Sequence, residues 1–165
     1  MKFTRSLRHL FATDWTTRRR FDAEVLTAIE AATREVESRH AGEIRFAIET
    51  AFDLPELWHD LSPRQRALQV FGFLGVWDTA ANNGVLIYVL NADHAVEIVA
   101  DRGIASRVVA AEWAAVCRKM EDHFRAGRYC EGAVYGVTTV GQLLNKHFPG
   151  SGADRNELPD QPVLL

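Results

Sequence analysis

The chain has 165 residues, of which 47% are hydrophobic and 25% charged, and its formal net charge at pH 7 is −3. This length and balance are typical of one soluble globular domain with its own hydrophobic core, which excludes a disordered or fibrous chain. The charge gives no reason to expect nucleic acid as a partner, and two cysteines are too few for a disulfide framework.

The first 20 residues are basic, with six of the 19 Lys and Arg residues and a single acid, Asp14. Apolar and basic side chains alternate there at a spacing that predicts a short amphipathic helix. Its candidate contact residues are Phe3, Arg5, Leu7, Arg8, Leu10 and Phe11. Such a helix would contact an anionic membrane surface or a protein partner, or would fold onto the domain's own core.

The elements that follow alternate in type. Helical spacing from Phe21 to Val36 predicts a longer helix that ends near Gly42. Alternation over 44–51 predicts a strand, and a polar loop with prolines follows it. Further along we expect a helix over 62–76 that begins with a capping box, strands over 85–90 and 95–100, and helices over 109–124 and 134–144.

The chain is thus divided into a basic segment over 1–20, an α/β domain over 21–148 and an extended or partly disordered tail over 149–165. No secretory signal or membrane-spanning run is visible, so we expect a cytoplasmic protein, in peripheral contact with the membrane if the first helix binds lipid.

The first two strands and the helix between them form a βαβ unit, so these strands should be parallel. The four residues between 90 and 95 suit a hairpin, which adds the third strand in antiparallel orientation. The predicted fold is therefore an α/β sandwich with a small mixed sheet.

The hairpin register predicts a first polar cluster. If residue 90 opposes residue 95, Gly84 opposes Asp101, and Asn82, Asn83 and Asp101 meet at one end of the sheet with Asp78 close in sequence. Carboxylate and amide oxygens are the ligands that calcium prefers. The alternative is structural, because Asn-Gly pairs form turns and an Asp after a strand often caps a helix.

A second cluster is expected at the opposite end of the sheet. Glu49 and Asp53 follow the first strand, and Asp93 lies in the hairpin turn. The carboxyl ends of parallel strands are where open α/β sheets bind ligands. Caps and turns are again the alternative.

Three stretches carry a resemblance to a known family: "AGEIRFAIE", "NNGVLIYVLNADHAVEIVADRGI" and "FRAGRYCEGAVYGVTTVGQLL". Over about residues 21–148 the chain resembles the TPM domain family, and in particular its small stand-alone bacterial members. The resemblance implies a three-layer α/β/α sandwich with a four-stranded sheet. It also implies binding of divalent cations such as calcium, acid phosphatase activity in plants, and maintenance of membrane complexes. This chain departs from the family after the third strand, where relatives carry a glycine-rich turn followed by an acid and this chain reads "ADRGIASRVV". The acidic metal ligand that the resemblance implies there is replaced unless Asp101 serves instead.

Motifs of nucleophilic catalysis are missing from the sequence. No arginine stands six residues after Cys117 or Cys130, and no Walker loop or nucleophile elbow is present. We therefore expect a non-catalytic accessory module that binds calcium through Asp78, Asn82, Asn83 and Asp101. Its partner would be another protein, such as a membrane-bound relative. The alternative is a weak metal-dependent acid phosphatase.

Overall fold

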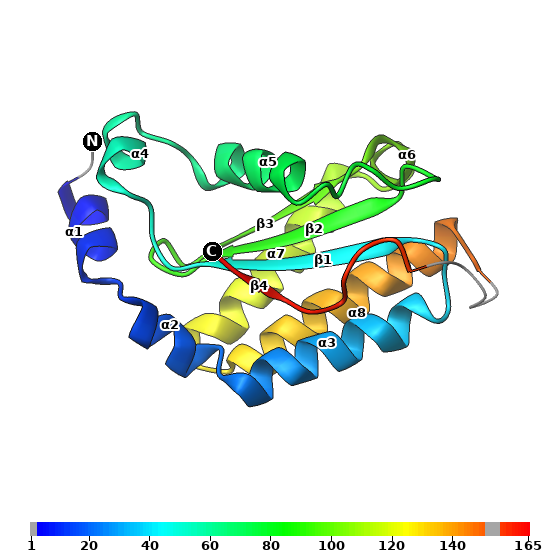
Figure 1. Ribbon diagram of the computed structural model, residues 1–165, viewed down its shortest axis with the longest axis horizontal. Helices are drawn as coiled ribbons and strands as arrows, with labels where there is room; N and C mark the ends of the chain where they lie inside the picture. The colour runs from blue at the N-terminus through cyan, green and yellow to red at the C-terminus, as the bar shows by residue number, and fades with distance from the viewer. Residues whose placement is uncertain (1–2, 151–155) are drawn as a thin grey trace.

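The chain folds into three layers, with a mixed sheet between two layers of helices (Figure 1). The computed structural model describes residues 3–150 and 156–165, with side chains from residue 5 onward. The described helices are α1 (Phe3–Phe11), α2 (Asp14–Arg20), α3 (Ala23–Glu37), α4 (Leu54–Trp58), α5 (Pro63–Phe73), α6 (Arg102–Ala105), α7 (Ala110–Arg125) and α8 (Tyr129–His147). The strands are β1 (Glu43–Glu49), β2 (Gly84–Leu90), β3 (Ala95–Ala100) and β4 (Val163–Leu164).

The sheet has the strand order β3-β2-β1-β4. β1 and β2 run parallel, and β2 and β3 form the expected hairpin, in which Leu90 pairs with Ala95 and Val85 with Ala100. The fourth strand comes from the C-terminal tail, where Val163 pairs with Ala47 in parallel orientation. Part of the tail is therefore a sheet edge, which the residues alone did not indicate.

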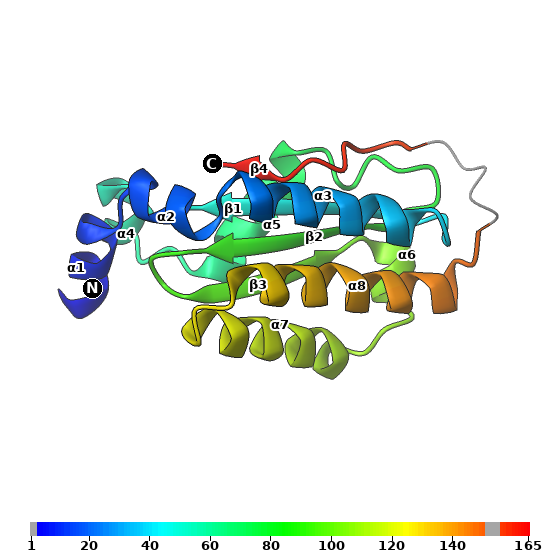
Figure 2. The same cartoon turned by 90° about the horizontal axis from the view of Figure 1, so that it is seen from below.

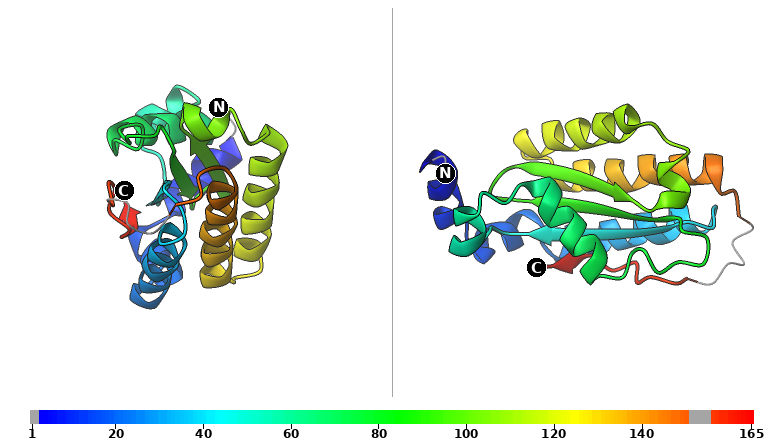
Figure 3. Two further views of the ribbon diagram at one scale, coloured as in Figure 1. Left: turned by 90° about the vertical axis from the view of Figure 1, so that its right-hand side faces the viewer. Right: turned by 90° about the horizontal axis from the view of Figure 1, so that it is seen from above.

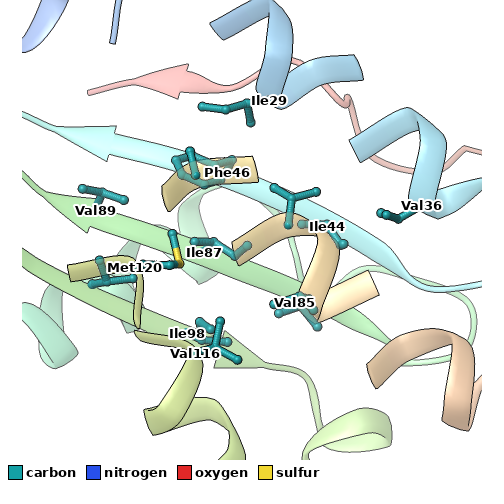
Figure 4. Packing of buried hydrophobic residues seen from close by; sticks show 14 of the residues in the cluster. Ile29, Val36, Ile44, Phe46, Val85, Ile87, Val89, Ile98, Val116 and Met120 are labelled. Carbon is teal, nitrogen blue, oxygen red and sulfur yellow. The ribbon is translucent and has the colours of Figure 1, made fainter. Parts of the chain in front are cut away.

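The two faces of the sheet carry separate cores because successive side chains of a strand point to opposite sides. α3, α7 and α8 cover one face and α5 the other (Figure 2, and end-on in the left panel of Figure 3). Figure 4 shows the first core, where Phe46, Ile87 and Ile98 meet Met120 and other side chains from the helices. Tyr88 is among the residues of the second core. All residues of β1 and β2 are buried, so both faces of these strands are covered.

The predicted capping box of α5 is confirmed. The Ser62 hydroxyl accepts a hydrogen bond from the Gln65 backbone N–H at 3.2 Å, and the Gln65 side chain accepts one from the Ser62 N–H at 3.0 Å. Thr13 caps α2, because its hydroxyl accepts a hydrogen bond from the Thr16 N–H at 3.3 Å. These local signals succeed because each needs only three or four neighbouring residues.

One local expectation was wrong. α4 lies inside the predicted loop, because a helix of five residues is too short to show a periodic pattern. The equally short α6 follows β3 directly and is capped by Asp101, which the sequence left open as the alternative role of that residue. α3 ends at Glu37, shortly before Gly42, as expected. Gly42 directly precedes β1, where a Cβ would lie 2.5 Å from Leu144 Cδ2, so a larger residue would have to displace the buried Leu144 side chain.

Candidate functional site

Asp78, Asn82, Asn83 and Asp101 are called the rim below. Asp101 donates its N–H to the Gly84 carbonyl at 2.9 Å, and the Gly103 N–H donates to the Asn82 carbonyl at 2.9 Å. The backbone around Asn82, Asn83 and Asp101 therefore meets at the amino end of β2, as the hairpin register predicts. Asp78 is exposed in the loop between α5 and β2.

The rim oxygens are partly engaged in local structure. Asp101 Oδ1 accepts a hydrogen bond from the Arg102 N–H at 2.7 Å and caps α6. Asn82, whose φ is +52°, accepts a hydrogen bond from Arg102 Nε at 3.0 Å. The Asn83 Nδ2 donates to the Ala41 carbonyl at 2.6 Å. The structural role that the sequence left as the alternative is thus real for these groups.

Two buried side-chain oxygens of the rim have no such role. Asp101 Oδ2 and Asn83 Oδ1 are buried and accept no hydrogen bond from any residue that the structure describes. A buried oxygen left without a partner costs about 1–3 kcal/mol. A cation at either oxygen would remove that cost. Carboxylate and amide oxygens are the donor types that a hard cation such as calcium prefers.

The rim differs from a carboxylate cage. In residues 3–150 and 156–165 no three His, Cys, Asp or Glu side chains gather as a metal ion would require. With Asp78 and Asp101 as its two acids, the rim has amide oxygens, on Asn82 and Asn83, as its other side-chain donors.

Glu49, Asp53 and Asp93, the second expected cluster, each bind a different partner and do not form one site. Arg66 Nη2 lies 2.7 Å from Glu49 Oε1, and the Tyr88 hydroxyl donates to Glu49 Oε2 at 2.5 Å. Burial, followed by the nearby Glu49 charge, raises the pKa of Tyr88. Asp53 begins α4, and its N–H donates to the Glu56 carboxylate at 2.9 Å. Glu49 and Asp53 therefore have structural roles.

Asp93, the third member, binds α1 to the domain. Arg5 Nε donates to Asp93 Oδ2 at 2.8 Å, and His9 Nε2 lies 3.1 Å from Asp93 Oδ1. Arg5 also donates to the Leu61 carbonyl at 2.8 Å, and the Phe52 N–H donates to His9 Nδ1 at 2.8 Å. The first helix is thus folded onto the domain through its polar face.

The outward face of α1 is apolar and basic. Leu7, Leu10 and Phe11 are exposed, and the side chain of Arg8 is half exposed while one of its nitrogens lies 3.4 Å from Asp93. Arg5 points inward, contrary to its place among the expected contact residues. The side chain of Phe3 lies outside the described residues.

Replacement of Asp93 tests this attachment. We expect Asp93→Ala to release α1, because Arg5 would lose its carboxylate partner in a half-buried site. Hydrogen exchange should then become faster over residues 5–11 and stay unchanged in β1 and β2. Asp60→Ala is the matched control, since Asp60 is exposed and lies 3.5 Å from the same arginine. Equal exchange in wild type and Asp93→Ala would show that α1 is held by other contacts.

An acidic pocket that the sequence did not indicate forms where the tail crosses α3. It has a volume of about 190 Å³ and includes Glu37, His40, Glu43 and Asp160 in its lining. Burial, and then the neighbouring Glu43 and Asp160 charges, raises the pKa of Glu37 to about 9. Burial also raises the pKa of Glu43 and lowers that of His40. Asp160 is far away in sequence, so no local pattern could have revealed this pocket.

The two cysteines differ in environment. Burial raises the pKa of Cys117 to about 12, so its thiol is protonated at neutral pH and is a poor nucleophile. Cys130 is exposed at the start of α8. None of the helices formed by the described residues is long and apolar enough to cross a membrane.

The sequence model of the TPM domain matches residues 18–143. The chain belongs to the TPM domain family. This TPM domain is similar to the solution structure of the BA42 protein from the psychrophilic bacterium Bizionia argentinensis. The two are 32% identical with a TM-score of 0.76, over 87% of this chain and 94% of that one.

Two further solution structures share the fold with this TPM domain. The N-terminal domain of a protein from P. gingivalis is 22% identical, with a TM-score of 0.57 over 73% of this chain and 75% of that one. The N-terminal domain of the cg2496 protein from Corynebacterium glutamicum is 14% identical, with a TM-score of 0.55 over 83% and 78%. Comparison with curated proteins gives no match.

The region that matches the TPM domain leaves out both ends of the structure. The rim lies inside residues 18–143, whereas α1 and most of α2 precede them and β4 follows them. In this TPM domain, Asp93 lies inside the matched region and binds α1, a helix that lies outside it.

Proposed function

We propose that this TPM domain is a non-catalytic accessory module that binds a divalent cation, calcium first among them, at the rim. The observation that carries the proposal is that Asp101 Oδ2 and Asn83 Oδ1 are each buried and lack a hydrogen-bond partner among the described residues. Asp78, exposed in the loop that leads from α5 to β2, would add a second negative charge. The family's expected role in maintaining a membrane complex, through a protein partner such as a membrane-bound relative, is part of this proposal.

Calcium binding should stabilise the fold. A ligand that binds only the native state at 100 times its Kd adds about 2.7 kcal/mol. For a domain of this size, that corresponds to a rise in Tm of about 5–10 °C. The measurement is a thermal melt of the full chain in calcium chloride and in chelator, with a calorimetric titration for the stoichiometry.

Two aspartates that each cap a helix, Asp101 and Asp22, provide a test variant and a matched control for calcium binding. Asp101→Asn keeps an acceptor for the α6 cap but removes the charge, so the calcium-dependent rise in Tm should disappear. Asp22→Asn makes the same change at the cap of α3, where the Asp22 side chain accepts from the Val25 N–H, and should leave the rise intact. An identical rise in wild type and Asp101→Asn would place the cation elsewhere.

A weak metal-dependent phosphatase activity would depend on the same carboxylates. Turnover of a generic phosphomonoester can be measured in the same samples, and we expect none above the level without protein. Calcium-dependent turnover that Asp101→Asn abolishes would contradict the non-catalytic assignment.

A further inference from the structure

A pocket with a basic lining lies at the end of the sheet opposite the rim, and it is called the basic pocket below. Its volume is about 250 Å³, and its lining includes Arg8, Phe11, Thr16, Arg20, Asn91 and His94. Asn91 directly follows β2, so the pocket stands at the carboxyl end of a parallel strand, where open α/β sheets bind ligands. Figure 1 shows α1 and α2 at this end of the sheet and α6 at the other.

Arg20 is held in place before any ligand arrives. Its Nη1 donates to Asn91 Oδ1 at 2.7 Å, and its guanidinium carbon lies 5.4 Å from the centre of the Tyr129 ring. Asn91 is itself buried and donates to the Thr17 hydroxyl at 2.8 Å. A fixed guanidinium loses little freedom when it binds an anion, which favours binding.

Positive charge exceeds negative charge around the basic pocket. Asp93 offers a single carboxylate to both Arg5 and Arg8, while Arg20 is held by neutral groups. Burial, and then the charges of Arg20 and Arg8, lowers the pKa of His94, although Asp93 opposes this effect. The surplus of positive charge therefore favours an anion, and guanidinium groups match phosphate oxygens in geometry.

Large apolar side chains surround this end of the molecule. Phe11 lines the basic pocket and is 74% exposed, Leu10 is 68% exposed and Trp15 on α2 is 67% exposed. α4, beside α1 in Figures 1 and 3, also exposes Leu54 and Trp58. Basic groups interleaved with exposed Phe, Leu and Trp are typical of a segment that lies at a membrane interface.

We propose that the basic pocket binds a phosphate group of an anionic phospholipid, while Leu10, Phe11 and Trp15 enter the boundary between headgroups and acyl chains. The complementarity of charge selects an anionic surface, and the exposed apolar side chains select a lipid rather than a free phosphate. The domain then approaches the membrane with the α1 end of the sheet and keeps the rim, at the opposite end, turned away. The proposal is independent of calcium.

The test is flotation of the full chain with vesicles of phosphatidylcholine, with and without phosphatidylglycerol, in the presence of chelator so that calcium cannot bridge protein and lipid. We expect binding only to the vesicles with phosphatidylglycerol. Arg8→Gln should lower the partition coefficient about fivefold, the effect of one basic group near an anionic surface. Phe11→Ser should lower it further, and circular dichroism should show that both variants fold.

Two control variants make the same substitutions at exposed positions outside the basic pocket. Arg118→Gln removes an exposed arginine from the middle of α7, and Phe73→Ser removes a phenylalanine that is 81% exposed at the end of α5. Neither should change vesicle binding. Equal binding to both kinds of vesicle, or equal losses in the controls, would overturn the proposal. The proposal would also be overturned if the wild-type protein bound neither kind of vesicle but was stabilised by inorganic phosphate, with the stabilisation lost in Arg8→Gln. That result would assign the pocket to a soluble ligand.

Discussion

Gly84→Ala is expected to lower the stability of the domain by about 3 kcal/mol and its Tm by about 6–12 °C. A Cβ at position 84 would lie 2.0 Å from the carbonyl oxygen of Val76, and Val76 is fully buried. The clash is with backbone rather than with a flexible side chain, so β2 or the loop after α5 must move. Denaturant or thermal unfolding of the purified variant measures the loss.

Gly72→Ala is the matched control for this substitution. Gly72 is exposed in α5, and a Cβ there would meet no atom within 4 Å. Alanine is the better helix former, so this variant should gain about 0.5–1 kcal/mol. If Gly84→Ala melted like wild type, the close approach between Val76 and the first residue of β2 would be refuted.

Glu37→Gln is expected to stabilise the domain at pH 8 by about 2–4 kcal/mol and to change its stability little at pH 4. The pKa of Glu37 is about 9 in the folded state against 4.5 for the free side chain. The folded state therefore binds more protons than the unfolded state between these values, and stability falls as the pH rises. The contribution of the protonated carboxyl is complete below about pH 4.5 and is lost as the pH rises through about 9.

Glutamine reproduces the neutral form of Glu37. Its carbonyl can accept from the Ile44 N–H, which donates to Glu37 Oε1 at 2.7 Å, and its amide can donate to Asp160. The measurement is the Tm of wild type and variant from pH 4 to pH 9. Glu35→Gln, at an exposed position of the same helix, should show no such pH-dependent difference. Parallel curves for wild type and Glu37→Gln would mean that Glu37 is solvated and that the tail does not cover it.

The acidic pocket also shows how the tail is held. Glu43 accepts backbone hydrogen bonds from Glu157 at 3.2 Å and Leu158 at 3.1 Å, and Arg45 Nη1 donates to the Gln161 carbonyl at 2.6 Å. These groups on β1 guide the tail toward its pairing as β4. Deprotonation of Glu37 would add a negative charge beside Asp160 of the tail. The docking of the tail is therefore linked to the pH dependence of stability.

The sequence by itself determined the centre of the fold. Alternation from Ile44 to Ile48 and the four residues between Leu90 and Ala95 determined β1, the hairpin and its register. From that register followed the meeting of Asn82, Asn83 and Asp101 at the amino end of β2. These predictions hold because side-chain alternation and turn length are local properties, which neighbouring residues decide.

Only the tertiary structure decided which polar groups remain available. Asp93 is engaged by Arg5 and His9, from a helix more than eighty residues earlier, and Glu49 by Arg66. Likewise, the buried oxygens of Asn83 and Asp101 are without a described partner only because of how the backbone around them packs. Burial and pairing depend on groups that are distant in sequence, because desolvation and hydrogen bonding act through space. A pattern of residue types therefore locates an oxygen but cannot tell whether it is free.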